Sequence, residues 1–374
     1  MRVGVPKEIK DQERRVGLIP ASVRELVSHG HEVLIESNAG AGIGADDSMY
    51  AESGAKVVDE ASDIFALSDM VVKVKEPQAS ERAMLREGQV LFTYLHLAPD
   101  LPQTTELVAS GAIAIAYETV TNDAGQLPLL APMSKVAGRM AVQAGAHCLE
   151  APQSGAGLLI GGVPGVAPAK VVVIGGGVVG ENATQIAVGM GADVTVFDRS
   201  LQVLDDLAAR FGSQIKTAYS TTAALEAAVV DADLVIGAVL VPGARAPKLV
   251  TAANVRAMRP GSVLVDVAID QGGCMETMYP TTHSDPTYIV DGVVHYAVAN
   301  MPGAVPHTAS AALNNATLPF VLALANKGVS AALRDDAHLR NGLNVAGGMV
   351  TEPAVAAAHD YDFIEPAQAL ASLR

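Results

Sequence analysis

A glycine-rich turn near the middle of the chain constrains the fold more than any other feature of the sequence. The segment GGGVVG, residues 175–180, follows the apolar run VVVI and opens the helical stretch ENATQIAVGMG. Asp198 ends the next apolar run and lies 18 residues after Gly180. A strand, spaced glycines, a helix and an acidic residue in this order are typical of a doubly wound α/β domain that binds a dinucleotide.

The same residues predict how the dinucleotide is bound. Gly175, Gly177 and Gly180 allow a tight turn and a close approach of the backbone to a pyrophosphate, which the N-terminus of the helix attracts. Asp198 is expected to accept hydrogen bonds from ribose hydroxyls. Because a carboxylate there repels a 2′-phosphate, the sequence favours NAD over NADP, although the neighbouring Arg199 argues in the other direction. A glycine-rich turn without a ligand is the alternative.

Short apolar runs alternate with helical stretches, which indicates parallel βαβ units. Strand-like runs are found at residues 2–6, 32–35, 70–74, 90–95 and 112–117, and again from residue 170 onward. We therefore predict an α/β protein with two doubly wound parallel-sheet domains and an interdomain cleft. Residues 131–305 form the predicted NAD-binding domain. Residues 1–130 form the predicted substrate and catalytic domain, together with residues 306–374, which turn helical again and are expected to pack back on it.

Composition argues against several classes of protein. The 374 residues carry a formal net charge of −15, which argues against nucleic-acid binding, and no apolar run reaches the ~18 residues of a membrane helix. Half of the residues are hydrophobic and 17% are charged, below the usual ~25%, so we expect apolar surface to lie between the subunits of a homo-oligomer. Two cysteines, no secretory signal and no cluster with metal-ligand spacing predict a cytoplasmic protein without a metal.

Four polar residues lie where a doubly wound fold binds its ligands, outside the carboxyl ends of the strands. His96 directly follows the run VLFTYL, Lys75 follows MVVKV, and Asp270 follows VLVDVAI. Arg15 lies in the charged loop after the first strand, beside Arg14. An imidazole, two cations and a carboxylate can bind an anionic substrate and transfer a proton. Taken singly, each has an ordinary alternative as a hydrogen-bonding, solvated or turn residue.

Longer phrases of the sequence carry a specific resemblance. They are GVPKEIK and E-x-RV near the start, VKVKEP at 72–77, LFTYLHLA at 91–98, AYETV at 116–120, LPLLAPMS at 127–134, LIGGVPGV at 159–166, IGAVLVPGARAPKLV at 236–250, VDVAIDQGG at 265–273 and VANMPGAVP at 298–306. Over nearly its whole length the chain resembles the alanine dehydrogenases, NAD-dependent enzymes that interconvert L-alanine with pyruvate and ammonium.

The resemblance implies a role for particular positions. Arg15 would pair with the substrate carboxylate, and Lys75 would contact the carboxylate or the carbonyl oxygen. His96 would be the general acid and base, and Asp270 the second catalytic residue. The positions implied to line the NAD site, beside the glycines of the turn, are Ser134, Val178, Val179, Asp198, Ser220, Val239, Leu240, Val267, Ala268, Ile269, Asp270, Val298, Asn300 and Met301. The family also implies a homohexamer.

Three positions depart from the family pattern. Arg14 stands where an aromatic residue is frequent, Val203 where a basic residue often follows the ribose-binding acid, and Ala156 where QGGRG would have its arginine. Three other functions remain open at this point. They are the NAD-binding subunit of a transhydrogenase, a non-catalytic NAD(H)-binding protein, and an amino-acid dehydrogenase with another side-chain preference.

Overall fold

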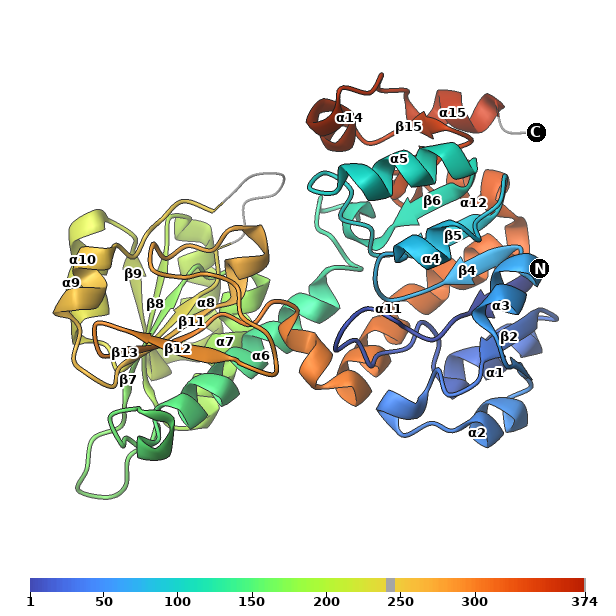
Figure 1. The fold of residues 1–374 in the computed structure, drawn as a ribbon. Coiled ribbons are helices and arrows are strands. Elements are labelled where there is room, and N and C mark those ends of the chain that lie inside the picture. The colour runs from blue at the N-terminus through green and yellow to red at the C-terminus, as the bar shows by residue number, and fades with distance from the viewer. Residues whose placement is uncertain (240–245, 373–374) are drawn as a thin grey trace. The chain divides into compact units, whose positions relative to one another are not determined.

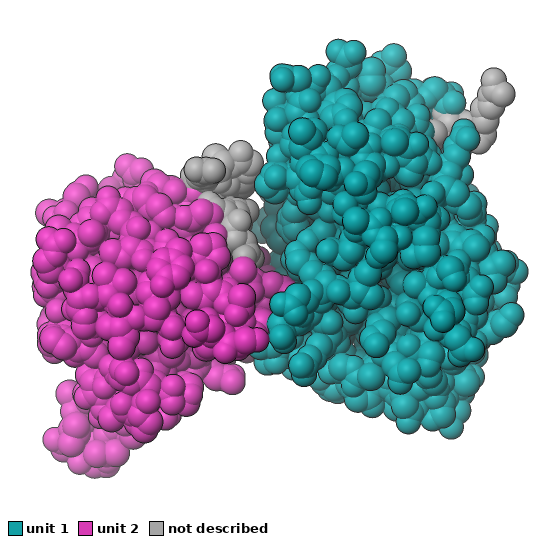
Figure 2. Space-filling view, in the orientation of Figure 1, with its two compact units in different colours: residues 1–133, 303–374 teal, residues 134–302 magenta. Residues whose placement is uncertain are grey.

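The chain folds into two compact units. A computed structural model describes residues 1–239 and 246–372, apart from the side chains at positions 270 and 271. Unit 1 comprises residues 1–133 and 303–374, and unit 2 comprises residues 134–302 (Figure 2). Each unit contains a mostly parallel sheet with helices, so the predicted α/β class is confirmed, with antiparallel strands added at the sheet edges. The predicted domain roles and the predicted cleft stay predictions.

Within the described residues, the sheet of unit 2 has seven strands in the order β12-β13-β11-β10-β7-β8-β9 (Figure 1). Its strands are β7 (Lys170–Ile174), β8 (Asp193–Asp198), β9 (Ile215–Tyr219), β10 (Leu234–Gly237), β11 (Val263–Asp266), β12 (Thr287–Val290) and β13 (Val293–Tyr296). All neighbours are parallel except β12 and β13. The chain leaves β7 toward β8 on one side and later returns to β10 on the other. This reversal is the switch point at which doubly wound sheets bind ligands.

Both faces of this sheet are buried, which explains why β7 is an uninterrupted apolar run. Val171 and Val173 belong to one hydrophobic core, whereas Val172 and Ile174 belong to a second core on the opposite face, and all four are at most 4% exposed. The helices of this unit are α6 (Ala131–Cys148), which begins in unit 1, α7 (Val178–Gly189), α8 (Leu201–Phe211), α9 (Thr222–Asp231) and α10 (Ala252–Ala257).

Unit 1 has an eight-stranded sheet in its described part, in the order β15-β14-β6-β5-β4-β1-β2-β3 (Figure 1). Its strands are β1 (Arg2–Val5), β2 (Glu32–Glu36), β3 (Lys56–Val58), β4 (Met70–Val72), β5 (Val90–Thr93), β6 (Ile113–Ala116), β14 (Leu343–Ala346) and β15 (Met349–Val350). Strands β1 to β6 are parallel, and β14 pairs antiparallel with β6. The C-terminal segment therefore completes the sheet that the N-terminal segment begins.

Helices of unit 1 come from both ends of the chain. They are α1 (Pro20–Ser28), α2 (Asp47–Glu52), α3 (Ala61–Leu67), α4 (Ala79–Arg82), α5 (Leu101–Ser110), α11 (Pro306–Lys327), α12 (Val329–Asp335), α13 (Ala337–Arg340), α14 (Pro353–His359) and α15 (Pro366–Ser372). The expected return to helix after Pro306 is present in α11 to α13. The strands β14 and β15 that follow, and the short strand β3, were not anticipated.

Helix α11 is long and apolar enough to cross a membrane by length and composition alone. It nevertheless packs into unit 1, because 44% of its most apolar window is buried. Polar side chains of the helix bind the loop after β1: the Ser310 hydroxyl accepts the Val16 N–H, and the side-chain amide oxygen Oδ1 of Asn314 accepts the Ile19 N–H. These contacts are those of a helix that packs in the core of unit 1.

A buried histidine on β13 makes the stability of unit 2 depend on pH. Burial lowers the pKa of His295 below its usual value, which favours the neutral imidazole. In that form Nδ1 donates to the Val293 carbonyl oxygen at 2.9 Å, and Nε2 accepts from the Thr277 hydroxyl at 2.7 Å. Below about pH 6.5 the His295 imidazole binds a proton in the unfolded chain but not in the folded chain. The free energy of unfolding therefore falls as the pH falls.

We expect the urea midpoint of the wild-type protein to drop between about pH 7.5 and 5.5 by more than that of His295→Gln, because the glutamine has no proton to take up. Parallel pH profiles for the two proteins would contradict this prediction.

Candidate active site

The glycine turn of unit 2 needs glycine for steric reasons. Gly175 has a φ of +96°, and a Cβ there would lie 2.8 Å from the Ala238 carbonyl oxygen. At Gly180 a Cβ would lie 1.8 Å from the Gly175 carbonyl oxygen, because helix α7 begins directly against the turn. A Cβ on Gly177, the residue that precedes α7, would meet no atom within 4 Å. The turn thus leaves open space at the N-terminus of a 12-residue helix, where an anionic group can approach the backbone.

Asp198 lies beside this turn at the end of β8. Its carboxylate accepts the Gly176 N–H at 2.7 Å and the Ser200 N–H at 2.8 Å. Ser220 follows the neighbouring strand β9 and donates its N–H to the Asp198 carbonyl oxygen. Val203 packs over the turn, 2.6 Å from where a Cβ of Gly176 would be, so an apolar group lies here instead of a cation.

The other predicted NAD-lining residues follow strand ends of the same sheet, except for Ser134 near the start of α6. Val239 follows β10, and residues 267–269 lie in the 3₁₀ turn η5 (Val267–Gln271) after β11. Val298, Asn300 and Met301 follow β13. Leu240 and the Asp270 side chain lie outside the described residues. The backbone of Asp270 belongs to η5, as its position after an apolar run predicted.

Two charged side chains that sequence reasoning missed, one buried and one exposed, hold the segment that carries Asp270. The Asp266 carboxylate, which is fully buried, accepts the N–H groups of Ala268 and Cys274. Burial raises the pKa of Asp266, although these hydrogen bonds oppose the effect. The Lys248 ammonium donates to three carbonyl oxygens, those of residues 272, 273 and 275. Both ends of the turn are therefore tied down.

Arg15 in unit 1 is 2% exposed and paired with a carboxylate. Its Nε and Nη2 atoms donate to Glu13 at 2.7 and 2.5 Å, and its Nη1 atom lies 3.1 Å from the Met133 sulfur. Burial alone would lower the pKa of Arg15, but Glu13 outweighs it and holds this pKa above its usual value. The guanidinium is therefore charged and held in one orientation.

Lys75 follows β4, and its backbone is held on both sides. The Glu8 carboxylate accepts the N–H groups of Val74 at 2.7 Å and of Lys75 at 3.3 Å. The Thr93 hydroxyl donates to the Lys75 carbonyl oxygen at 2.9 Å.

Glu8 also belongs to a cluster of charged side chains, with Lys73 and Glu81, that are at most 2% exposed. The Lys73 ammonium lies 3.1 Å from Glu8 and 2.6 Å from Glu81. Burial alone would lower the pKa of Lys73, but the two carboxylates hold it above its usual value. Lys73 and Glu8 were not singled out from the sequence, although a lysine inside the apolar run MVVKV was a visible signal.

His96 follows β5 in a conformation that few side chains adopt. Its φ is +50°, in the left-handed region, and its side chain is 46% exposed. Backbone strain of this kind costs about 1–3 kcal/mol and is concentrated at functional sites. The imidazole stacks on the ring of Tyr94 with the centroids 5.9 Å apart. The Glu118 carboxylate accepts the His96 N–H at 2.6 Å, a contact that the sequence did not reveal.

Both units thus carry their polar groups at the carboxyl ends of parallel strands, and the turn of unit 2 is built to receive a dinucleotide. These features are typical of the class of α/β oxidoreductases that use a dinucleotide.

Comparison with known proteins narrows this class. Residues 4–137 match the family model "Alanine dehydrogenase/PNT, N-terminal domain", and residues 141–353 match the corresponding C-terminal domain. The chain belongs to the alanine dehydrogenase/PNT family. It is 58% identical over 367 residues to alanine dehydrogenase of Halomonas elongata, an alignment that covers 98% of this chain and 99% of that protein.

Solved structures agree with this assignment. An L-alanine dehydrogenase superposes with a TM-score of 0.94 at 56% identity, covering 96% of this chain and 99% of that one. A transhydrogenase from Sinorhizobium meliloti superposes with a TM-score of 0.83 at 25% identity, covering 94% and 100%. The second match shows that the fold is shared with proteins of another activity.

Proposed function

We propose that this protein catalyses the reversible, NAD-dependent oxidative deamination of L-alanine to pyruvate and ammonium. The observation that carries the proposal is similarity to alanine dehydrogenases along the full chain, with Lys75 and His96 following strands of unit 1 and Arg15 in the loop after β1. Relatives that are 51–58% identical to this chain over nearly its full length are alanine dehydrogenases.

The coenzyme fits the turn of unit 2 in charge and in space. The open side of Gly177 and the N-terminus of α7 would receive the pyrophosphate, and Asp198 would bind the ribose hydroxyls. NAD⁺ supplies the hydride acceptor when bound. Residues of the chain itself would bind the amino acid, exclude bulk water and transfer protons.

Arg15 and Lys75 would bind the substrate carboxylate. A guanidinium can pair with a carboxylate through two parallel hydrogen bonds, and the ion pair with Glu13 holds the Arg15 side chain in one orientation. Binding of the substrate carboxylate in one orientation would also orient the Cα–H bond from which the hydride leaves. Loss of the hydride from Cα and of a proton from nitrogen leaves an iminium, to which water adds.

His96 would accept the proton from the amine, activate the water and return a proton to the departing ammonia. Imidazole suits this work because it exchanges protons near neutral pH. Asp270 would stabilise the cationic nitrogen during these steps. The balance is L-alanine, NAD⁺ and water going to pyruvate, ammonium, NADH and one proton.

The proposal is tested by following NADH absorbance at alkaline pH with purified protein, NAD⁺ and L-alanine. Turnover that requires L-alanine and is lost with D-alanine or NADP⁺ is the expected result. Hydride transfer between nucleotides without an amino acid would instead identify a transhydrogenase-like protein. Nucleotide binding without any turnover would identify a non-catalytic one.

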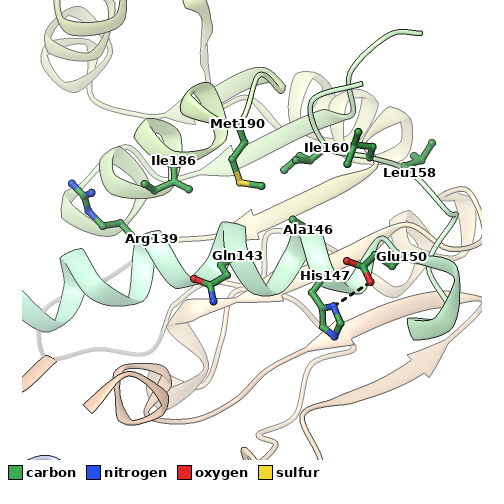
Figure 3. Close-up of a pocket in the computed structure, with 10 residues that line it drawn as sticks. Arg139, Gln143, Ala146, His147, Glu150, Leu158, Ile160, Ile186 and Met190 are labelled. Atoms are coloured by element: carbon green, nitrogen blue, oxygen red, sulfur yellow. Dashed lines mark ion pairs between the residues drawn. The ribbon is translucent and has the colours of Figure 1, made fainter. Parts of the chain in front are cut away.

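We also propose a homo-oligomer, of six subunits if the family pattern holds, in the cytoplasm. A hollow of about 400 Å³ on unit 2 is lined by residues of α6 and α7 and by residues 158–160 (Figure 3). Leu159, which lines it, and Val163 and Val166 in the segment that follows are more than half exposed, which suits burial against a second copy. The two free cysteines fit a reducing compartment. Light scattering at several protein concentrations measures the subunit number.

A further inference from the structure

We propose that Glu118 is a positioning residue for His96: its carboxylate holds the turn that presents the imidazole and selects the ring nitrogen that does the chemistry. The inference rests on the role proposed above for His96 and adds a residue to which no role has been given. It starts from the sheet of unit 1. Strands β5 and β6 are parallel neighbours, and Thr93 pairs with Ala116 at their ends, so the segments that follow lie side by side.

Glu118 uses this adjacency to bind the backbone of the neighbouring segment. Its Oε1 atom accepts the N–H of Leu95 at 3.1 Å and the N–H of His96 at 2.6 Å. The carboxylate is 14% exposed, whereas Leu95 is fully buried. Hydrogen bonds to an ionised acceptor are stronger than those between neutral groups. They stabilise a turn in which His96, a residue with a Cβ, adopts a φ of +50°.

The carbonyl groups of the same segment are bound from the other side. Gln103 donates its amide to the Leu95 carbonyl oxygen at 2.7 Å, and the Thr104 hydroxyl donates to the Leu97 carbonyl oxygen at 3.1 Å. The segment is therefore held on both its N–H and its C=O groups. Without Glu118, helix α5 would still hold the carbonyl side, while the N–H side could relax toward an ordinary conformation.

The same carboxylate faces the imidazole. The Nδ1 atom of His96 lies 3.7 Å from Oε1 of Glu118, too far for a hydrogen bond but within the distance of an ion pair. Tyr94 stacks on the ring with an interplanar angle of 5° and limits its rotation. With Nδ1 directed at Glu118, Nε2 is the nitrogen that exchanges protons with the substrate.

A second site in unit 1 provides a matched control. Asn38 follows β2, has a φ of +63°, and its N–H is accepted by the Asp47 carboxylate at 2.8 Å. The arrangement is the same as at His96: a carboxylate accepts the N–H of a residue that has a left-handed backbone conformation and follows a parallel strand. Asn38, however, has no proposed catalytic role. Asp47→Asn should therefore reproduce the structural part of Glu118→Gln and none of its catalytic part.

The experiment compares kcat and KM for L-alanine in the wild type, Glu118→Gln and Asp47→Asn. Glu118→Gln should lower kcat about 100-fold, the effect of misplacing a reacting group by ~1 Å. Its KM for L-alanine should change less than about threefold, because Arg15 and Lys75 bind the carboxylate. When His96→Ala is already present, adding Glu118→Gln should lower kcat by less than about twofold, because the imidazole that Glu118 positions is absent.

The control variant Asp47→Asn should retain the wild-type kcat within about twofold.

Two results would overturn the inference. One is equal kcat in Glu118→Gln and Asp47→Asn at equal loss of thermal stability. The other is additive losses in the His96→Ala background.

Amide hydrogen exchange tests the structural part without any turnover, so it separates this inference from the proposed function. Glu118→Ala should speed exchange at Leu95 and His96 by about tenfold or more, which corresponds to the loss of a hydrogen bond. Unchanged exchange at both amides would show that Glu118 does not hold the turn. A wild-type protein that lacks alanine turnover but passes the exchange test would refute the proposed function alone.

Discussion

His96→Ala should reduce kcat for L-alanine oxidation by about 10²- to 10⁴-fold, the range that a general acid and base contributes. The substitution removes the imidazole that follows β5 and leaves Arg15, Lys75 and the glycine turn of unit 2 in place. The dissociation constant for NAD⁺, measured by calorimetry, should therefore stay within about threefold of the wild-type value, because no residue of the turn changes.

The chain offers a matched control for this substitution. His29 is also in unit 1, is 40% exposed and lies 3.4 Å from the Glu25 carboxylate, but it follows helix α1 instead of a strand. His29→Ala should keep kcat within about twofold, as a surface substitution does. A kcat for His96→Ala within about tenfold of wild type would remove His96 from the proton-transfer steps.

Lys73→Met should destabilise unit 1 by about 3–5 kcal/mol, the usual effect of removing one partner from a buried ion pair. The ammonium lies between Glu8 and Glu81, and the side chains of all three are at most 2% exposed. Without it, two carboxylates remain buried together, and burial already raises the pKa of Glu8. Glu8 also binds the Lys75 N–H, so the loss should reach the substrate site. The urea midpoint at fixed protein concentration measures the effect.

Two further variants decide whether the buried charges are responsible. Lys170→Met breaks an ion pair with Asp231 in which both side chains are about half exposed or more, so its effect should stay below about 1 kcal/mol. The triple variant Glu8→Gln, Lys73→Met, Glu81→Gln leaves no buried charge in the cluster and should recover part of the lost stability. If the triple variant were less stable than Lys73→Met alone, charge burial would not be the cause.

Local patterns made much of the fold predictable. The turn at residues 175–180 contains four glycines between an apolar strand and a helix, all within one short segment, so no distant contact was needed to recognise it. Strand β14 could not be found in this way, because LNVA is short and is a strand only through pairing with β6, more than 200 residues earlier. Strand β9 is an edge strand with exposed positions, so its residues lack the apolar pattern by which a strand is predicted.

The candidate site likewise contains residues that local patterns reveal and residues that only distant contacts reveal. The positions of His96 and Asp198 after apolar runs were visible, because the carboxyl end of a strand is a local feature. Their partners were not, because Glu118 meets His96 only through the order of strands in the sheet. Glu8 likewise reaches Lys75 from a distant loop. Sequence patterns indicate which side chains lie after the ends of strands, whereas the order of strands in the sheet determines which of these residues form hydrogen bonds with one another.

The return of the C-terminal segment to unit 1 has a consequence for the order in which the protein matures on the ribosome. Unit 2 is one continuous stretch and is fully synthesised by residue 302, whereas the sheet of unit 1 lacks β14 until residue 346 has been added. Until then β6 is an open, apolar sheet edge, the kind of surface that recruits other chains. Translation of the last 70 or so residues therefore closes a vulnerable edge, and a chain that ends early is exposed to aggregation even though unit 2 is complete.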